Sequence, residues 1–217
     1  MSVAGPVPPS PDDAASFARA RLGVEADASS RFVGVEGSRL SGRATLRGVP
    51  YDAGALAVIY WRRLPEAALG AGVMNLVVTD RLMTTQGEDG RPHARVNLMA
   101  EPYVLSTSGL VEGPARPRGY YIARRATAGT GLEALAEADA KVEHAGSFLE
   151  YDDPRMSRVA IGPALQCVFH FATGEPFCDE AGCMLYNAHW QEELLAAQLG
   201  DRLCERHAKA LEEMSCR

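Results

Sequence analysis

The sequence predicts a mixed α/β fold of the α+β kind, with a mixed β-sheet, helices and a mainly helical C-terminal third. Three observations support this prediction. Short runs rich in Val, Ile, Leu and Tyr, separated by Gly and Pro, fill much of the first half of the chain. After Gly131 the apolar residues take up helical spacing and few are β-branched. The 217 residues suit one domain and are enough to bury a core.

The N-terminal half is predicted to run from a short disordered segment through one helix into strands. Residues 1–10 are rich in Pro and are expected to be disordered, whereas residues 11–217 are expected to form a single domain. A helix is predicted from the cap residue Ser10 to Gly23, because Pro and two acids follow the cap. The predicted strands lie at 31–37, 55–61, 74–85, 94–107 and 119–125.

The C-terminal third is predicted to be helical in three segments. They span 132–145, 154–171 and 188–214. Pro163 is expected to kink or split the second segment, and Gly200 to interrupt the third. Before them, the stretch from Ser106 to Tyr121 holds several Gly, Pro and Arg residues and is predicted to be loop-like in its middle. It is either a plain surface crossing or one side of a binding groove.

The charge of the chain argues against several partners. The net charge of −6 and the pI near 5.4 exclude nucleic acid and an anionic membrane surface as main partners, since both need a basic face. A local basic group is interpreted as a solvated loop or, alternatively, an anion site; it comprises Arg116, Arg118, Arg124 and Arg125. The stretch from Gly70 to Asn75 lacks the lysine of a phosphate-binding loop, which argues against nucleotide binding.

No feature predicts a membrane or a secretory route. No run reaches about 18 apolar residues, the length needed to span a bilayer. The first residues lack both a basic start and an apolar core, so they are not expected to form a signal peptide. A cytoplasmic location is therefore expected.

Two pairs of metal-type donors follow one another near the C-terminus. Cys178 and Cys183 are separated by four residues, Cys204 and His207 by two, and twenty residues lie between the pairs. A closed zinc site needs four soft or borderline donors in a tetrahedron, and each pair can supply two. In a reducing compartment this clustering favours a metal over disulfides. The sequence therefore predicts one structural zinc ion, bound by these four residues within a subregion of about 174–210.

Alternatives to this ligand set remain open. Buried free thiols are common in protein cores, although they explain one cysteine better than two close pairs. The polar turn around Cys178, GEPFCDEAGC, is the kind of loop that presents a thiolate. His189, next to Trp190, is an alternative fourth ligand, and the terminal Cys216 is expected to take no part.

The cysteine-rich segment resembles the second half of the archaemetzincin signature. These zinc metallopeptidases carry H-E-x-x-H-x-x-G-x-x-H-C, continued by C-x4-C-x-M and, after about seventeen residues, C-x-x-C. Cys178 and Cys183 match the C-x4-C, whereas Cys204 and His207 fall one residue late on the C-x-x-C, with His in place of the last Cys. The match covers about forty residues, and the ending CMLYNAHWQEEL is similar to that of another metallopeptidase-like group.

The resemblance implies a zincin-like mixed sheet with helices and a structural zinc site, but not a catalytic one. In archaemetzincins the histidines bind a catalytic zinc, the Glu acts on its water, and the cysteines bind a second zinc. Here Gly174 matches the family's glycine. The catalytic positions are degenerate, because the three histidines fall on Cys167, Phe171 and Phe177 and the Glu on Val168. Catalytic zinc needs three protein donors, and water activation needs a base.

These substitutions leave the function, and whether the protein is an enzyme, open. The first hypothesis is a non-catalytic zinc-binding protein that recognises a peptide or protein, with no binding residues assigned. The second is an active hydrolase or peptidase with a rebuilt metal or Cys–His centre. Candidates for that centre are Cys167 as a nucleophile beside a His, or a metal set drawn from Glu175, His144, His93 and Glu143. His170 lies one residue from the second ligand position, about 100° around a helix. The third is a zinc-stabilised fold without a readable role.

Overall fold

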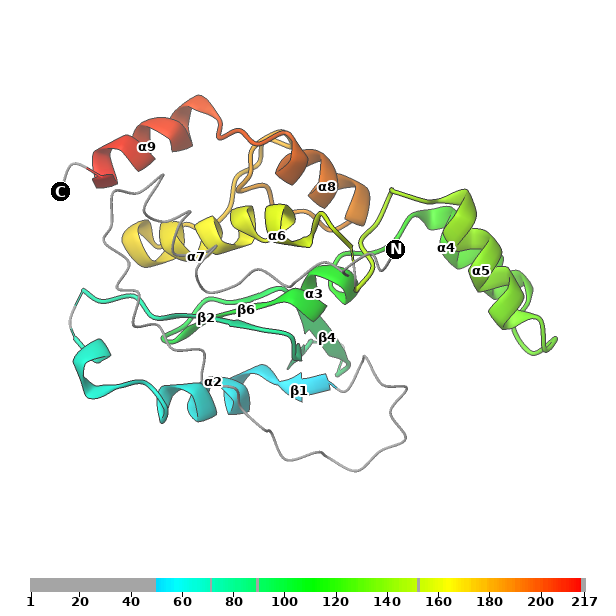
Figure 1. Ribbon diagram of the computed structural model, residues 1–217, viewed down its shortest axis with the longest axis horizontal. Helices are drawn as coiled ribbons and strands as arrows, with labels where there is room; N and C mark the ends of the chain where they lie inside the picture. Colours follow the sequence, from blue (N-terminus) through cyan, green and yellow to red (C-terminus); the bar gives the residue numbers. More distant parts are fainter. Residues whose placement is uncertain (1–49, 71, 89, 152, 216–217) are drawn as a thin grey trace, which may run out of the picture.

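The structure is a computed structural model that describes residues 50–215, except 71, 89 and 152. The described residues form two small sheets with helices packed around them (Figure 1). The predictions for residues 1–10, the helix Ser10–Gly23, the strand at 31–37 and Cys216 all lie outside the described residues. Within the described part, the mixed α+β class and the helical C-terminal third are confirmed.

The first sheet has the strand order β1-β3-β4. β1 (Pro50–Asp52) runs parallel to β3 (Leu82–Gln86), with Tyr51 opposite Met83. β4 (Pro92–Arg95) runs antiparallel to β3 on its other side. This sheet is thus mixed, as predicted, but it contains only three of the described strands. The other three form a second sheet.

The second sheet has the strand order β2-β6-β5. The central strand β6 (Tyr103–Ser106) runs parallel to β2 (Leu76–Thr79) and antiparallel to β5 (Asn97–Leu98). All four residues of β6 are buried, as expected for a central strand covered on both faces. The predicted runs at 74–85 and 94–107 therefore contain real strands, divided between two sheets.

The strand predicted at 55–61 is wrong, because this segment forms helix α2 (Ala53–Trp61). Asp52 caps the helix and accepts a hydrogen bond of 2.8 Å from the Ala55 backbone N–H. Its buried residues Ala53, Leu56 and Tyr60 follow helical spacing. The sequence of this segment is apolar throughout and shows no helical periodicity. Such a run is compatible with either a buried strand or a buried helix.

The strand predicted at 119–125 is also wrong, because it belongs to helix α4 (Arg118–Ala126). The predicted helix at 132–145 is confirmed as α5 (Glu133–Glu143), which forms a hairpin with α4. Arg116, just before α4, places its guanidinium 4.8 Å from the ring centre of Tyr120, so this arginine is not a freely solvated loop residue. Upstream, helix α3 (Thr107–Glu112) occupies the start of the predicted loop.

The last third contains four helices within the described range. The predicted break near Pro163 is found as α6 (Met156–Val159) followed by α7 (Ile161–Thr173). Pro163 is tolerated in the first turn of α7, where a backbone N–H has no intrahelical partner. The predicted interruption at Gly200 is confirmed, because it separates α8 (Gln191–Leu199) from α9 (Glu205–Ser215).

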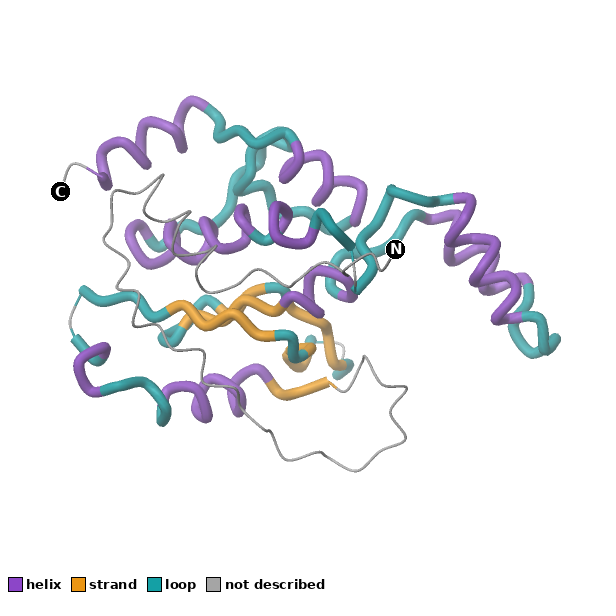
Figure 2. Tube along the Cα trace, viewed as in Figure 1, coloured by secondary structure: helices purple, strands orange, loops and turns teal. Residues whose placement is uncertain are grey.

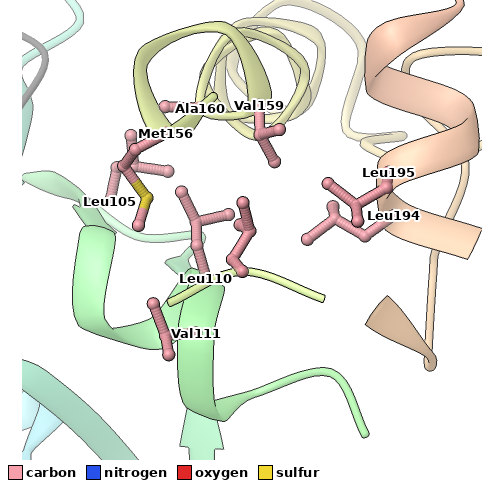
Figure 3. Close-up of a cluster of buried hydrophobic side chains, with 9 residues drawn as sticks. Leu105, Leu110, Val111, Met156, Val159, Ala160, Leu194 and Leu195 are labelled. Carbon is pink, nitrogen blue, oxygen red and sulfur yellow. The ribbon is translucent and has the colours of Figure 1, made fainter. Parts of the chain in front are cut away.

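Three clusters of buried side chains form the core. The first joins α2 to β3 and β6, and the second joins β6 and α3 to α6 and α8. Figure 3 shows the second cluster, in which Leu110 lies between Met156 and Leu195. The third cluster surrounds the cysteines and includes residues of α7 and α9. None of the helices in the described range is long and apolar enough to cross a bilayer.

Candidate metal centre

The four predicted ligands converge on one point. The donor atoms of Cys178, Cys183, Cys204 and His207 all lie within 4.8 Å of one another. The Cys178 and Cys204 sulfurs are 3.8 Å apart. His207 Nδ1 lies 3.7 Å from the Cys183 sulfur and 3.0 Å from the Cys204 sulfur. Spacing in the sequence alone could not guarantee this convergence, because two distant chain segments have to meet.

The first pair of cysteines is presented by a compact turn after α7. Gly174 ends the helix in the left-handed conformation, with φ of 79°, and donates its N–H to His170. The chain then forms hydrogen bonds from Cys178 N–H to the Leu185 carbonyl and from Cys183 N–H to the Glu180 carbonyl. These bonds turn both side chains toward the same side.

The second pair lies at the start of α9. The N–H of Ala208 donates to the Cys204 carbonyl, so Cys204 and His207 are joined by the first turn of the helix. Residues three apart on a helix are neighbours on one face. The Met184 N–H donates to the Arg202 carbonyl and ties this turn to the first pair.

Two buried glutamines, which the sequence analysis did not identify, also support the turn. Gln166 on α7 donates its side-chain N–H to the Tyr186 carbonyl at 3.2 Å. Gln198 on α8 donates to the Met184 carbonyl at 2.9 Å. Both interrupt otherwise apolar helical stretches, and an amide in such a position signals a buried backbone group that needs a partner.

The cluster is shielded from water by apolar side chains. All four residues are at most 6% exposed. They pack with Leu165, Phe169 and Leu211, and the Phe169 ring meets the His207 ring edge-on at 5.3 Å. A structural site is closed in this way, whereas a catalytic metal keeps a position open to water and substrate.

The donor geometry suits a metal better than a disulfide. A disulfide requires sulfurs about 2.05 Å apart. A tetrahedral zinc ion with Zn–S bonds of ~2.3 Å places two sulfurs roughly 3.8 Å apart and a sulfur and a nitrogen roughly 3.6 Å apart. The 3.8 Å and 3.7 Å distances match these values, and the 3.0 Å distance is that of a close hydrogen-bonded pair. Three thiols and an imidazole are also the donor types that zinc prefers.

Burial shifts the pKa values of two of the candidate ligands, Cys183 and His207. Burial raises the pKa of the Cys183 thiol to about 11, so a thiolate there needs nearby positive charge. Burial also lowers the pKa of His207, which keeps the imidazole neutral, the form that binds metals. Arg206 supplies positive charge at the rim, since a hydrogen bond to the Cys178 side chain raises the pKa of its guanidinium.

The positions that the resemblance assigns to a catalytic zinc do not form a second metal-binding group among the described residues. Cys167 is fully buried, and Val168 packs against the cluster around the cysteines. Phe171 and Phe177 are 41% and 43% exposed. Neither phenylalanine ring carries a donor for a metal. The residues that the resemblance assigns to catalytic zinc therefore contribute only one thiol.

Cys167 is expected to be unreactive in the folded protein. Burial raises the pKa of its thiol to about 12, so the thiol stays protonated at pH 7. Iodoacetamide at pH 8 should label Cys167 in guanidinium but not in the native protein, as measured by peptide mass spectrometry. Rapid native labelling of Cys167 would contradict this expectation and favour a thiol nucleophile.

The other candidate residues have partners of their own and form no metal-binding group among the described residues. His170 Nδ1 shares a hydrogen bond of 2.8 Å with the Tyr103 hydroxyl and makes none with Cys167. His144 lies against Gly119 on α4, and His93 lies on β4 opposite Thr85. His189 is bound through its backbone to Ala115 and Glu193 rather than to the cysteine cluster. Among the described residues, no second group of three or more Cys, His, Asp or Glu side chains is close enough to bind a metal.

Comparison with known proteins places the chain in a described family. Residues 11–214 match a family described as "Probable metallopeptidase family (DUF6775)". No curated protein and no solved structure matches the chain. The match covers nearly the whole sequence and includes both pairs of the cysteine cluster.

Proposed function

Since the chain belongs to this probable metallopeptidase family, we propose that it is an archaemetzincin-like member that has kept a structural zinc site and lost the catalytic one. It then acts without hydrolysis, as a zinc-binding protein that recognises a peptide or another protein. The zinc ligands in this proposal are Cys178, Cys183, Cys204 and His207. Zinc bound there holds the turn after α7 against the start of α9.

One observation carries the proposal: the metal-type donors are closed and buried, while the positions of the catalytic ligands offer almost none. A buried site with four protein donors has no open position for water. Hydrolysis by the familial mechanism would require donors at Phe171 and Phe177 and a base at Val168. The zinc is therefore proposed to stabilise the fold rather than to react.

Exposed aromatic rings support recognition of a peptide. Phe171 and Phe177 are both partly exposed, and they stand at positions where archaemetzincins have metal ligands. The Tyr103 ring packs edge-on against Phe171 with their centres 6.2 Å apart, which fixes one wall of this surface. Aromatic side chains of this kind provide anchor points for apolar side chains of a partner.

The proposal also includes a location and a domain organisation for the protein. The cysteines at 167, 178, 183 and 204 form no disulfides, which suits a reducing compartment such as the cytoplasm. Residues 11–217 are proposed to form a single domain.

Metal analysis of the purified chain tests the proposal. We expect one zinc per chain by inductively coupled plasma mass spectrometry, retained against EDTA and released only as the circular dichroism signal of folding is lost, because structural zinc binding is coupled to folding. The non-catalytic role would be refuted by two zinc ions per chain, if EDTA removed one of them from the folded chain and thereby abolished a measured peptide-hydrolysing activity. Phe171→Ala serves as a companion variant, expected to keep the zinc.

A further inference from the structure

The α4–α5 hairpin extends away from the rest of the molecule (Figures 1 and 2). Its helices pack on each other, and the Tyr120 ring packs against Phe148, just outside the hairpin, with the ring centres 5.8 Å apart. Among the described residues, none of the three core clusters contains a residue of either helix. Helices of nine and eleven residues are marginal in water without tertiary packing. Apart from the contact of Tyr120 with Phe148 and Arg116, the hairpin therefore takes no part in the core clusters that support the other helices.

Apolar side chains lie exposed on this hairpin. Leu132, Leu135 and Val142 are 56%, 60% and 79% exposed. Their spacing of three and seven residues places them along one face of α5, from its N-cap to its last turn. On α4, Tyr121 and Ile122 are 42% and 60% exposed. We call these five residues the hairpin stripe. Exposed apolar surface concentrated on one element marks an interaction site.

The two helices carry opposite charges. The segment Arg118–Ala126 contains three arginines and no acid, so its charge is +3. The segment Glu133–Glu143 contains four acids and one lysine, so its charge is −3. The partner surface that complements this hairpin would be apolar, with one acidic and one basic helix. The hairpin itself has that composition.

We propose that the hairpin stripe is a dimerisation surface that binds the hairpin of a second copy of this chain. In a two-fold arrangement each α4 lies against the partner subunit's α5, so both helix contacts between subunits join +3 to −3. The four helices form an antiparallel bundle, and the stripe residues of both copies become its interior. A second copy supplies both charges and the apolar surface at once, which is why it is preferred to an unrelated partner.

The mass of the full chain in solution tests the proposal. Sedimentation equilibrium over a concentration series is expected to show a dimer of the 23.3 kDa chain. Leu135→Glu combined with Val142→Glu should raise the dissociation constant roughly a hundredfold or more, because two charges per copy enter the interface. Val58→Glu is the matched control, since Val58 is 51% exposed on α2, away from the hairpin. It should leave the dissociation constant unchanged.

A charge-exchange experiment identifies the arrangement. Variant one carries Arg118→Glu and Arg125→Glu, and variant two carries Asp139→Arg and Glu143→Arg. Each alone should dimerise more weakly than the wild type, because like charges meet across the interface. A mixture of the two should form a heterodimer, since each reversed helix then meets its complement. A wild-type chain that is monomeric up to about 100 µM, or a dimer that the Leu135 and Val142 substitutions leave intact, overturns the proposal.

Discussion

Cys204→Ala is expected to abolish zinc retention and to lower the free energy of unfolding by about 4 kcal/mol or more. The Cys204 sulfur lies within 3.8 Å of the Cys178 sulfur and 3.0 Å of His207 Nδ1, so it connects the two pairs. Without it, three donors remain and the turn after α7 loses its link to α9. Cys178→Ala should have a similar effect, because it removes a donor from the other pair.

The measurement combines zinc content with chemical denaturation. Cys167→Ala is the control: it also removes a buried thiol from α7, but one outside the metal cluster. It should keep one zinc and lose about 1 to 2 kcal/mol, the cost of a small cavity. Equal losses of stability in both variants, with zinc content unchanged, would show that Cys204 does not bind a structural zinc ion.

Gly109→Ala is expected to destabilise the fold by about 3 kcal/mol. A Cβ atom at Gly109 would lie 2.9 Å from the Arg95 carbonyl carbon and closer still to its oxygen. That neighbour is backbone of β4, so no rotamer change relieves the clash. Helix α3 would have to move away from the sheet and disturb Leu110, which is fully buried in the second core cluster.

Thermal or urea denaturation measures this effect, with Gly54→Ala as the control. Gly54 is also helical, but the nearest atom to its added Cβ is a side-chain oxygen of Asp52 at 3.3 Å. Alanine favours a helix over glycine by roughly 1 kcal/mol, so this variant should be neutral or more stable. A Gly109→Ala protein as stable as Gly54→Ala would show that α3 does not pack this closely against β4.

The two donor pairs were predictable because the signal of each pair is local. Each pair of donors lies within one turn, and a turn fixes the relative positions of side chains a few residues apart. The same logic predicted the break near Pro163, since a proline restricts the backbone locally. The Gln166 and Gln198 amides were not predicted, because their carbonyl partners come from segments 14 to 20 residues away.

The two wrong strands have a different cause. The runs at 55–61 and 119–125 are rich in residues that suit strands, and propensity favoured them there. Yet Asp52 and Pro117 begin helices just before them, and packing of the helix face decides the outcome. Propensities differ by about 1 kcal/mol or less per residue, which burial of a single large side chain exceeds.

By itself, the sequence determined the donor types, their paired spacing and the residue types at 167, 168, 171 and 177, because these are properties of residue identity and of short stretches of chain. Only the tertiary structure decided that the two pairs meet, that Cys167 is sealed in the core and that the α4–α5 hairpin stands apart with its apolar face exposed. Those features depend on contacts between distant segments, and their free energy comes from burial that no local pattern specifies.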